Sequence, residues 1–229
     1  EKNLENLIEN HEGNIDDIFD VIKDWANDRK FRLAVQFIRD EIDSDEVTTG
    51  LSNVAETVIK TLTKYIEKHI EETTGELPGG SFAAIAFGKL GSRELTFNSD
   101  LDLVFVYDIP EDVFSLKGSG SSANPSSYFL RLAGKLVYAL SSISRTGKLY
   151  EVDLRLRPFG ESGPIAASLD NFNNYYRPEK KQGSAWIWEY MALTRARVIS
   201  TYPKFAYQVT EEIKDKLYHK WDDEVLFRE

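Results

Sequence analysis

The segment Leu77-Pro78-Gly79-Gly80 divides the chain into two parts whose apolar residues follow different periods. Proline and glycine together interrupt regular structure, so the chain is expected to change its conformation here. Before this segment, apolar residues recur every three or four positions, which predicts amphipathic helices over about 15–42 and 51–70. After it, short apolar runs at 82–87 and 100–107 predict buried strands.

The remaining elements follow from the same patterns. We expect an exposed loop over 115–127, a helix over 126–143, strands over 149–157 and 165–168, and further helix from Phe205 onward. Helices therefore come first, a small mixed sheet with helices second, and helices last. This order indicates an α+β fold.

Charge is distributed unevenly about the same boundary. Residues 1–80 contain 19 acidic and 9 basic residues, whereas residues 81–229 contain 19 of each. The net charge of −10 therefore belongs to the first region, which indicates two regions with different roles. An acidic chain does not suit broad binding to phosphate backbones, so we expect no nucleic-acid partner.

Composition excludes further classes of site. The chain has no cysteine, which excludes a disulfide framework and a thiolate metal site. No apolar run approaches the length of a membrane span, and we expect no signal peptide. We therefore expect a cytoplasmic protein with no membrane partner.

Two carboxylates stand close together on the second predicted strand. Asp100 and Asp102 are two residues apart, so a strand would direct both to the same face. Carboxylates held this close repel one another unless a positive charge lies between them. A divalent ion such as Mg²⁺ would supply that charge. An Asp-x-Asp pair by itself is also common among ordinary surface acids.

The predicted strand at 149–157 carries charges in the same alternating manner. Glu151, Asp153, Arg155 and Arg157 alternate with apolar residues. Asp153 could complete a set of three carboxylates for two metal ions, and the arginines could bind a phosphate through paired hydrogen bonds. The alternative is an exposed strand whose charges neutralise one another.

A glycine-containing turn, Gly88-Lys89-Leu90-Gly91-Ser92-Arg93-Glu94, follows the first predicted strand. Glycine lets a backbone approach a ligand closely, and amides at a helix start favour phosphate. The turn matches neither the G-x-x-x-x-G-K-[ST] nor the G-x-G-x-x-G motif. A Gly-Ser turn, an Asp-x-Asp strand and a third Asp on another strand are together typical of nucleotidyl transfer, in which the turn holds the triphosphate and the carboxylates hold metal.

Three longer motifs resemble the glutamine synthetase adenylyltransferase family, in the same order and over about residues 50–200. They are Gly88-Lys89-Leu90-Gly91-Ser92-Arg93-Glu94-Leu95 running into Asn98-Ser99-Asp100-Leu101-Asp102-Leu103, then Tyr150-Glu151-Val152-Asp153-Leu154-Arg155-Leu156-Arg157-Pro158, then Ala185-Trp186-Ile187-Trp188-Glu189-Tyr190-Met191-Ala192-Leu193-Thr194-Arg195-Ala196-Arg197-Val198. The resemblance implies a nucleotidyltransferase domain of the polymerase-β type, in a bacterial enzyme with two such domains joined by helices. One copy would remove AMP from a tyrosine of glutamine synthetase by phosphorolysis, and the other would add it from ATP, under control of glutamine and the PII signal protein.

The third motif and the glycine turn look like the adding copy, which we favour. The segment 157–164 is closer to the removing copy, which stays an alternative. By this resemblance the chain is a fragment. Residues 1–80 would be a helical inter-domain linker, 81–200 the catalytic domain, and 201–229 the start of a C-terminal helical region.

The resemblance also implies roles for single residues. Asp100 and Asp102 would bind two Mg²⁺ ions, and Asp153 would complete the second site and help deprotonate the attacking tyrosine. The remaining site residues would contact the phosphates of ATP: Gly91 and Ser92 through backbone amides and the Ser hydroxyl, and Arg155, Arg157 or Lys89 by neutralising charge.

Other readings of this sequence remain open. Trp186 and Trp188 are expected to be packing residues rather than a platform for adenine, and Arg195 and Arg197 could equally be core-lining helix residues paired with Glu189. A nucleotidyltransferase for a small molecule or an RNA would share the Gly-Ser and Asp-x-Asp core. A regulatory module that binds nucleotide or PII without catalysis is the third class.

Overall fold

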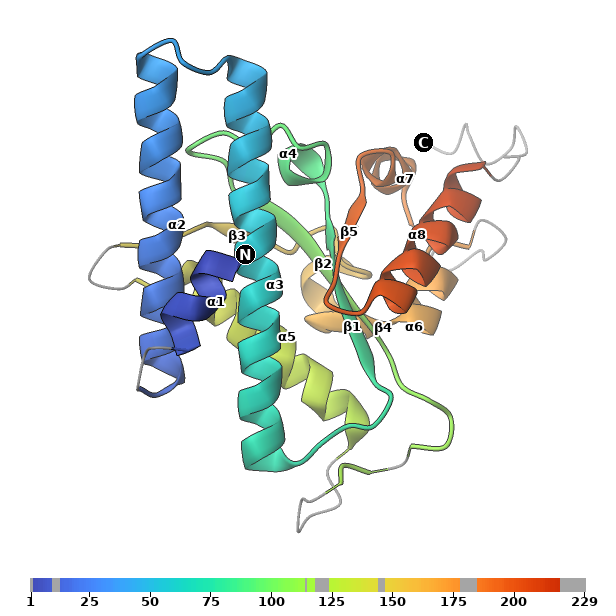
Figure 1. Cartoon of the computed structure of the whole chain (residues 1–229). Helices are drawn as coiled ribbons and strands as arrows, with labels where there is room; N and C mark the ends of the chain where they lie inside the picture. Colours follow the sequence, from blue (N-terminus) through green and yellow to red (C-terminus); the bar gives the residue numbers. More distant parts are fainter. Residues whose placement is uncertain are drawn as a thin grey trace.

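The computed structural model describes residues 2–9, 13–113, 115–117, 124–143, 147–177 and 185–218. A short helix, α1 (Lys2–Glu9), precedes two long ones, α2 (Ile15–Ile38) and α3 (Ser44–Thr74), which lie antiparallel as a hairpin (Figure 1). Reciprocal capping boxes start both long helices, Asn14 with Asp17 and Asp43 with Glu46. The predicted helices are therefore confirmed, although α2 ends before residue 42 because Asp40 adopts a φ of 54°.

Five short strands form one mixed sheet. Strand β1 (Ser81–Ala86) pairs antiparallel with β2 (Leu101–Asp108) and with β5 (Arg197–Ile199). The other edge of β2 pairs in parallel first with β3 (Val152–Asp153) and then with β4 (Ala166–Ser168). The α+β class predicted from the sequence is confirmed.

Helices cover both faces of the sheet (Figure 1). On one face lie α3 and α5 (Pro125–Ser141), which pack on the odd-numbered residues of β2, such as Leu103 and Phe105. On the other face lie α6 (Leu169–Tyr175), α7 (Ile187–Leu193) and α8 (Pro203–Tyr218), over Val104 and Val106. Because side chains of a strand alternate between faces, Asp102 belongs to the α6–α8 face, at the end where β2 begins.

The helical hairpin and the sheet share one continuous apolar core. Its members include Ile22 from α2, Leu62 from α3 and Phe105 from β2, all of them fully buried. Full burial of a side chain of this size contributes roughly 1.5–3 kcal/mol to folding. The hairpin is therefore held against the sheet by packing as well as by the chain connection.

Two expectations about secondary structure were wrong in part, and one strand was not predicted. The strand predicted over 149–157 is reduced to β3, because the N–H of Arg155 donates to Oδ1 of Asp153 and starts a turn. The loop predicted as exposed over 115–127 contains a buried Leu116, and α5 starts at Pro125; residues 118–123 lie outside the described residues. Strand β5 gave too short a signal to be predicted.

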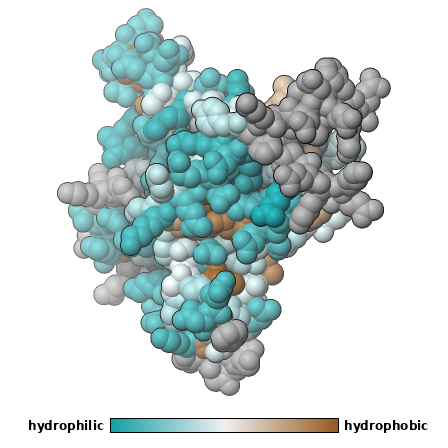
Figure 2. Space-filling view, turned by 90° about the vertical axis from the view of Figure 1, so that its right-hand side faces the viewer, coloured by the Kyte–Doolittle hydropathy of each residue, from teal (hydrophilic) through white to brown (hydrophobic). Residues whose placement is uncertain are grey.

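The outer surface is largely polar where it can be described. Seen from the side of α6 and α8, hydrophilic residues cover most of the coloured surface, and hydrophobic ones are confined to small areas (Figure 2). Among the described residues, none of the helices is both long enough and apolar enough to span a membrane. The helix predicted from Phe205 onward is confirmed by α8 as far as Tyr218, with Phe205, Val209 and Ile213 buried; residues 219–229 lie outside the described residues.

Candidate active site

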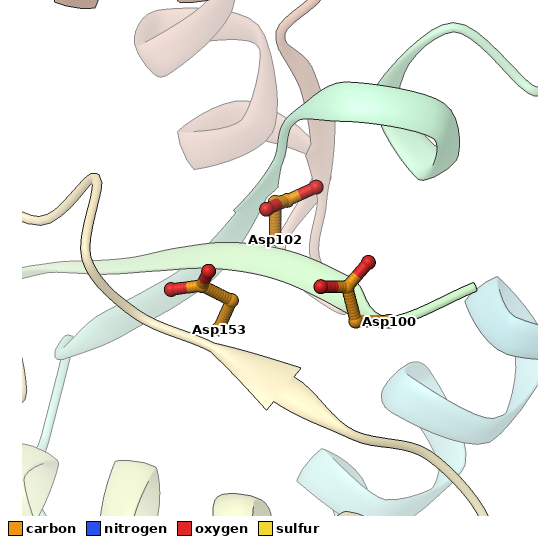
Figure 3. A group of neighbouring side chains, drawn as sticks. All are labelled: Asp100, Asp102 and Asp153. Carbon is orange, nitrogen blue, oxygen red and sulfur yellow. The ribbon is translucent and has the colours of Figure 1, made fainter.

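Three aspartates meet at the beginning of β2. Asp100 immediately precedes this strand, Asp102 lies on it, and Asp153 lies on β3 directly opposite Asp102 in the parallel register. One carboxylate oxygen of each lies within 4.8 Å of the others, with the side chains turned toward a common space (Figure 3). The structure thus brings together all three carboxylates predicted to bind metal.

The charges of this aspartate triad, Asp100, Asp102 and Asp153, act on one another. Burial, with the negative charges of Asp100 and Asp153, raises the pKa of Asp102. A hydrogen bond from Arg155 instead lowers the pKa of Asp153. A cation bound by the triad would therefore relieve repulsion among its carboxylates. The donor atoms are all oxygens, which Mg²⁺ prefers.

Arg155 is exposed and forms an ion pair with Asp153. Its Nε lies 3.0 Å from Oδ1 and 2.8 Å from Oδ2, and Nη2 also bonds to Oδ2. The guanidinium thus occupies one side of the third carboxylate. Asp153 is partly buried, but the Arg155 side chain is largely in solvent, so we expect it to be able to turn toward an anion in the cleft.

The glycine turn forms a single helical turn, α4 (Gly88–Gly91), against the triad. Gly88 has a φ of +52°, and a Cβ at this position would collide with Oδ2 of Asp102. Gly91 is needed for space, because a Cβ there would collide with the carbonyl oxygen of Arg195. Both glycines therefore let the turn approach its neighbours closely, and Asp102 lies between α4 and β3 (Figure 3).

Two backbone N–H groups that were predicted to bind phosphate are already hydrogen-bonded within the turn. The N–H of Gly91 donates to Phe87 at 2.9 Å, and that of Ser92 donates to Gly88 at 3.2 Å. The Ser92 hydroxyl is 3.0 Å from both the Gly88 carbonyl and a carboxylate oxygen of Glu94. Gly91 thus contributes space rather than a donor, and the groups that can exchange partners are the Ser92 hydroxyl and the exposed ammonium of Lys89.

A cleft of about 580 Å³ opens beside the triad on the β3 side. Asp100, Asp153, Arg155 and Arg157 contribute to its lining, together with Glu151, Val152, Leu154 and Glu161. Arg157 donates to the carbonyls of Leu154 at 2.9 Å and Gly163 at 3.3 Å, and so holds the turn that follows β3. Of the predicted phosphate-binding arginines, Arg155 is therefore the more available.

A charged residue that supports the site, Glu56, was not assigned by sequence reasoning. Glu56, on α3, pairs with Arg197 of β5, which also donates to the carbonyls of Leu90 and Gly91. The alternative in which Arg195 and Arg197 pair with Glu189 is wrong: Arg195 faces Glu94 at 3.6 Å, and Glu189 accepts from Tyr175 and the Trp186 backbone. Glu56 lies away from the apolar stripe predicted for this helix, so no local pattern indicated its role.

The two tryptophans of the third motif do not pack inside the protein. Trp186, the N-cap residue of α7, is 64% exposed, and Trp188, in the first turn of this helix, is 52% exposed. The expectation that they are packing residues is therefore wrong. The reason is local: α7 has only seven residues, and its buried side is already filled by Glu189, Tyr190 and Leu193.

Comparison with known proteins gives the family of this chain. The sequence profile described as glutamate-ammonia ligase adenylyltransferase matches residues 1–212. A protein of Xanthobacter autotrophicus (strain ATCC BAA-1158 / Py2), named bifunctional glutamine synthetase adenylyltransferase/adenylyl-removing enzyme, is 39% identical over 191 residues, which are 81% of this chain and 19% of the relative. Proteins of the same name from Rhodopseudomonas palustris (strain ATCC BAA-98 / CGA009) and Brucella suis biovar 1 (strain 1330) are 33% and 35% identical, over 93% and 88% of this chain and 21% and 20% of the relatives. The chain spans about a fifth of the length of these relatives.

Proposed function

Because this chain belongs to the glutamate-ammonia ligase adenylyltransferase family, we propose that it transfers AMP from ATP to a tyrosine hydroxyl of glutamine synthetase. The observation that carries the proposal is the meeting of Asp100, Asp102 and Asp153 beside the glycine turn α4. Acidic residues alone would indicate only a cation site. Here the cation site adjoins the glycine turn α4, which approaches Asp102 closely, and a cleft that contains the exposed Arg155. Such a site suits a nucleoside triphosphate.

The three carboxylates are the proposed ligands of Mg²⁺, and the resemblance implies that they would hold two ions. When bound, Mg²⁺ supplies charge neutralisation at the phosphates and polarises the phosphoryl group that is transferred. Asp102 bridges the two halves of the site, since it lies between Gly88 of the turn and Asp153 of β3. We assign the Ser92 hydroxyl and Lys89 to the triphosphate on the α4 side.

Proton transfer is assigned to Asp153. The tyrosine oxygen attacks the α-phosphorus, the bond from that phosphorus to the bridging oxygen breaks, and pyrophosphate leaves. A tyrosine hydroxyl has a pKa of about 10 in solution and is therefore protonated at neutral pH. Its proton passes to the Asp153 carboxylate. The Arg155 hydrogen bond lowers the pKa of Asp153, so the carboxylate becomes a better acceptor when Arg155 turns to the phosphates. There the guanidinium would stabilise the charge that develops.

Removal of AMP by phosphorolysis is the second candidate, because the relatives' name covers both activities. The same carboxylates would serve it, with orthophosphate as the attacking group. Transfer to a small molecule or an RNA stays a weaker alternative. Control by PII, a cytoplasmic location, and the division into a linker (1–80), a catalytic domain (81–200) and a C-terminal helical region (201–229) stay predictions from the resemblance.

The two directions are separated by one pair of reactions. The full chain is incubated with glutamine synthetase, Mg²⁺ and ATP labelled at the α-phosphate, and separately with adenylylated glutamine synthetase, Mg²⁺ and orthophosphate. We expect label on the protein substrate in the first reaction and no ADP in the second. A parallel reaction with a metal chelator should remain unlabelled.

The other outcomes each point to a different function. ADP from the second reaction alone would assign the removing activity. Labelling of an added RNA or small-molecule acceptor, with glutamine synthetase inert, would overturn the protein substrate while keeping the nucleotidyl chemistry.

A further inference from the structure

Asp153, the third carboxylate of the triad, lies on a very short strand. Strand β3 consists of Val152 and Asp153 alone, and a turn begins at the next residue. Pairing over two residues fixes a strand weakly, because each paired residue contributes only one or two hydrogen bonds. The position of Asp153 relative to Asp102 must therefore depend on what holds the segment just before β3.

That segment, Leu149–Glu151, is held from three sides. The N–H of Tyr150 donates to the Leu140 carbonyl of α5 at 3.1 Å, and the N–H of Leu101 on β2 donates to the Glu151 carbonyl at 2.9 Å. The third contact comes from outside the sheet layer: Nζ of Lys30, on α2, donates to the Leu149 carbonyl at 3.0 Å. Each contact fixes a different residue of the segment.

Lys30 also lies on the ring of Tyr150. Its Nζ is 3.6 Å from the ring centroid, and Tyr150 itself is buried. A cation over an aromatic face is attracted to it, more strongly where water is excluded. Lys30 is partly buried, and this burial lowers its pKa to about 8. The same side chain thus fixes two consecutive residues, Leu149 and Tyr150, four and three positions before Asp153.

We propose that Lys30 is a positioning residue for the metal site, because its ammonium anchors the segment from which β3 extends and so sets Asp153 opposite Asp102. The inference rests on the proposed function only in taking the aspartate triad as a cation site. It gives the helical hairpin a part in the site although α2 contributes no side chain to the cleft. A merely structural role would instead affect folding without changing the affinity for metal.

The chain contains a matched control in Lys23. This lysine is also on α2, is 3% exposed, and reaches the same connection between α5 and β3. Its Nζ donates to the carbonyl of Ser142 at 3.1 Å and to its hydroxyl at 2.9 Å, at the C-terminal end of α5. Lys23 therefore anchors the far end of the connection, eleven residues before Asp153, and should matter for stability but not for the metal.

The test measures binding of Mn²⁺, as a probe for the site, to the full chain without nucleotide, by the electron paramagnetic resonance signal of the free ion. Wild type is compared with Lys30→Met, Lys30→Arg and Lys23→Met. We expect Lys30→Met to weaken binding roughly tenfold, the lower end of what loss of a supporting contact around a metal ligand produces. Lys30→Arg, which can still bond the carbonyl and stack on Tyr150, should stay within about twofold of wild type, as should Lys23→Met.

The outcomes separate this inference from the proposed function. Equal Mn²⁺ affinity in Lys30→Met and wild type would overturn the positioning role and leave the metal site standing, as would an equal loss in Lys23→Met. Failure of wild type itself to bind Mn²⁺ would overturn the metal site on which the proposed function depends. Should Lys30→Met not fold, Lys30→Gln replaces it, and wild-type affinity in that variant counts against the inference.

Discussion

The molecule contains two groups of neighbouring acidic residues that differ in what lies next to their carboxylates. At the active site, the aspartate triad converges on open space, and within the described residues Arg155 is the cation that forms an ion pair with it. On α3, Glu67 and Glu71 face two tyrosines: the Tyr202 hydroxyl donates to Glu67 at 3.0 Å and the Tyr128 hydroxyl to Glu71 at 3.4 Å.

Exposure separates the two groups. Glu67 is 8% exposed, and burial raises its pKa to about 7 despite the hydrogen bond from Tyr202. A buried acid supplied with hydroxyl donors is part of the protein's packing. The triad adjoins a cleft, and a bound cation would relieve the repulsion among its three carboxylates. Removal of acids should therefore affect binding in one group and folding in the other.

The largest effect is expected from the triad. Asp100→Asn combined with Asp102→Asn should lower the rate of AMP transfer at least about a thousandfold, since the metal supplies several kcal/mol to the reaction. The free energy of unfolding should not fall, because repulsion among the carboxylates is reduced. Initial rates and urea unfolding test both statements. Asp108→Asn, at the exposed far end of β2, is the control; a double variant that still transfers AMP contradicts the metal assignment.

Glu67 should show the reverse behaviour. Its pKa is about 7 in the folded protein and 4.5 as the ordinary value, so between these pH values the folded state binds more protons. Stability contributed by this proton is present below pH 4.5 and is lost as pH rises through 7. Glu67→Gln should therefore raise the free energy of unfolding at pH 8 by up to about 3 kcal/mol, and hardly at all near pH 4.5.

Urea unfolding of the Glu67→Gln variant at both pH values checks this prediction. Glu72→Gln, at an exposed position on the same helix, controls for the loss of one negative charge. A gain that is equal at the two pH values would show that burial of the charge is not its cause.

A smaller effect is expected where the backbone meets the triad. Gly88→Ala would place a Cβ against Asp102 at a φ of +52°, which costs about 1–2 kcal/mol of stability in a left-handed conformation. Transfer should fall together with stability because Asp102 is displaced. Gly134→Ala on α5 meets no atom within 4 Å and should instead stabilise the helix by up to about 1 kcal/mol. Urea unfolding and transfer rates are measured for both variants. Equal behaviour of Gly88→Ala and Gly134→Ala would contradict the role given to Gly88.

The smallest effect concerns the exposed pair at Asp153. Arg155→Ala should change the urea midpoint little, because the Arg155 side chain is largely in solvent, and should raise the pKa of Asp153. A carbon-13 titration of the aspartate carboxyls measures this directly. Arg32→Ala, which breaks an exposed pair with Asp28, should leave Asp153 unaffected. An unchanged Asp153 titration in Arg155→Ala would show that Arg155 is not what lowers this pKa.

Much of the fold and part of the site could be predicted from local patterns. Spacing placed the helices α2, α3 and α5 and the strands β1 and β2, because periods of 3.6 and 2 are set within a few residues. The same reasoning placed Asp100 and Asp102 on one side of β2. It overestimated β3, because a single side-chain-to-backbone hydrogen bond at Asp153 starts a turn that an alternating pattern does not reveal.

By itself, the sequence determined the α+β class, the two neighbouring carboxylates and the family, since each depends on residues close together in the chain. Only the tertiary structure decided that Asp153 lies opposite Asp102, that Arg197 pairs with Glu56, and that Lys30 anchors the segment before β3. These partners are separated by 51, 141 and 119 positions in the chain. Contacts across such distances follow from how helices and strands pack together, which no local period encodes.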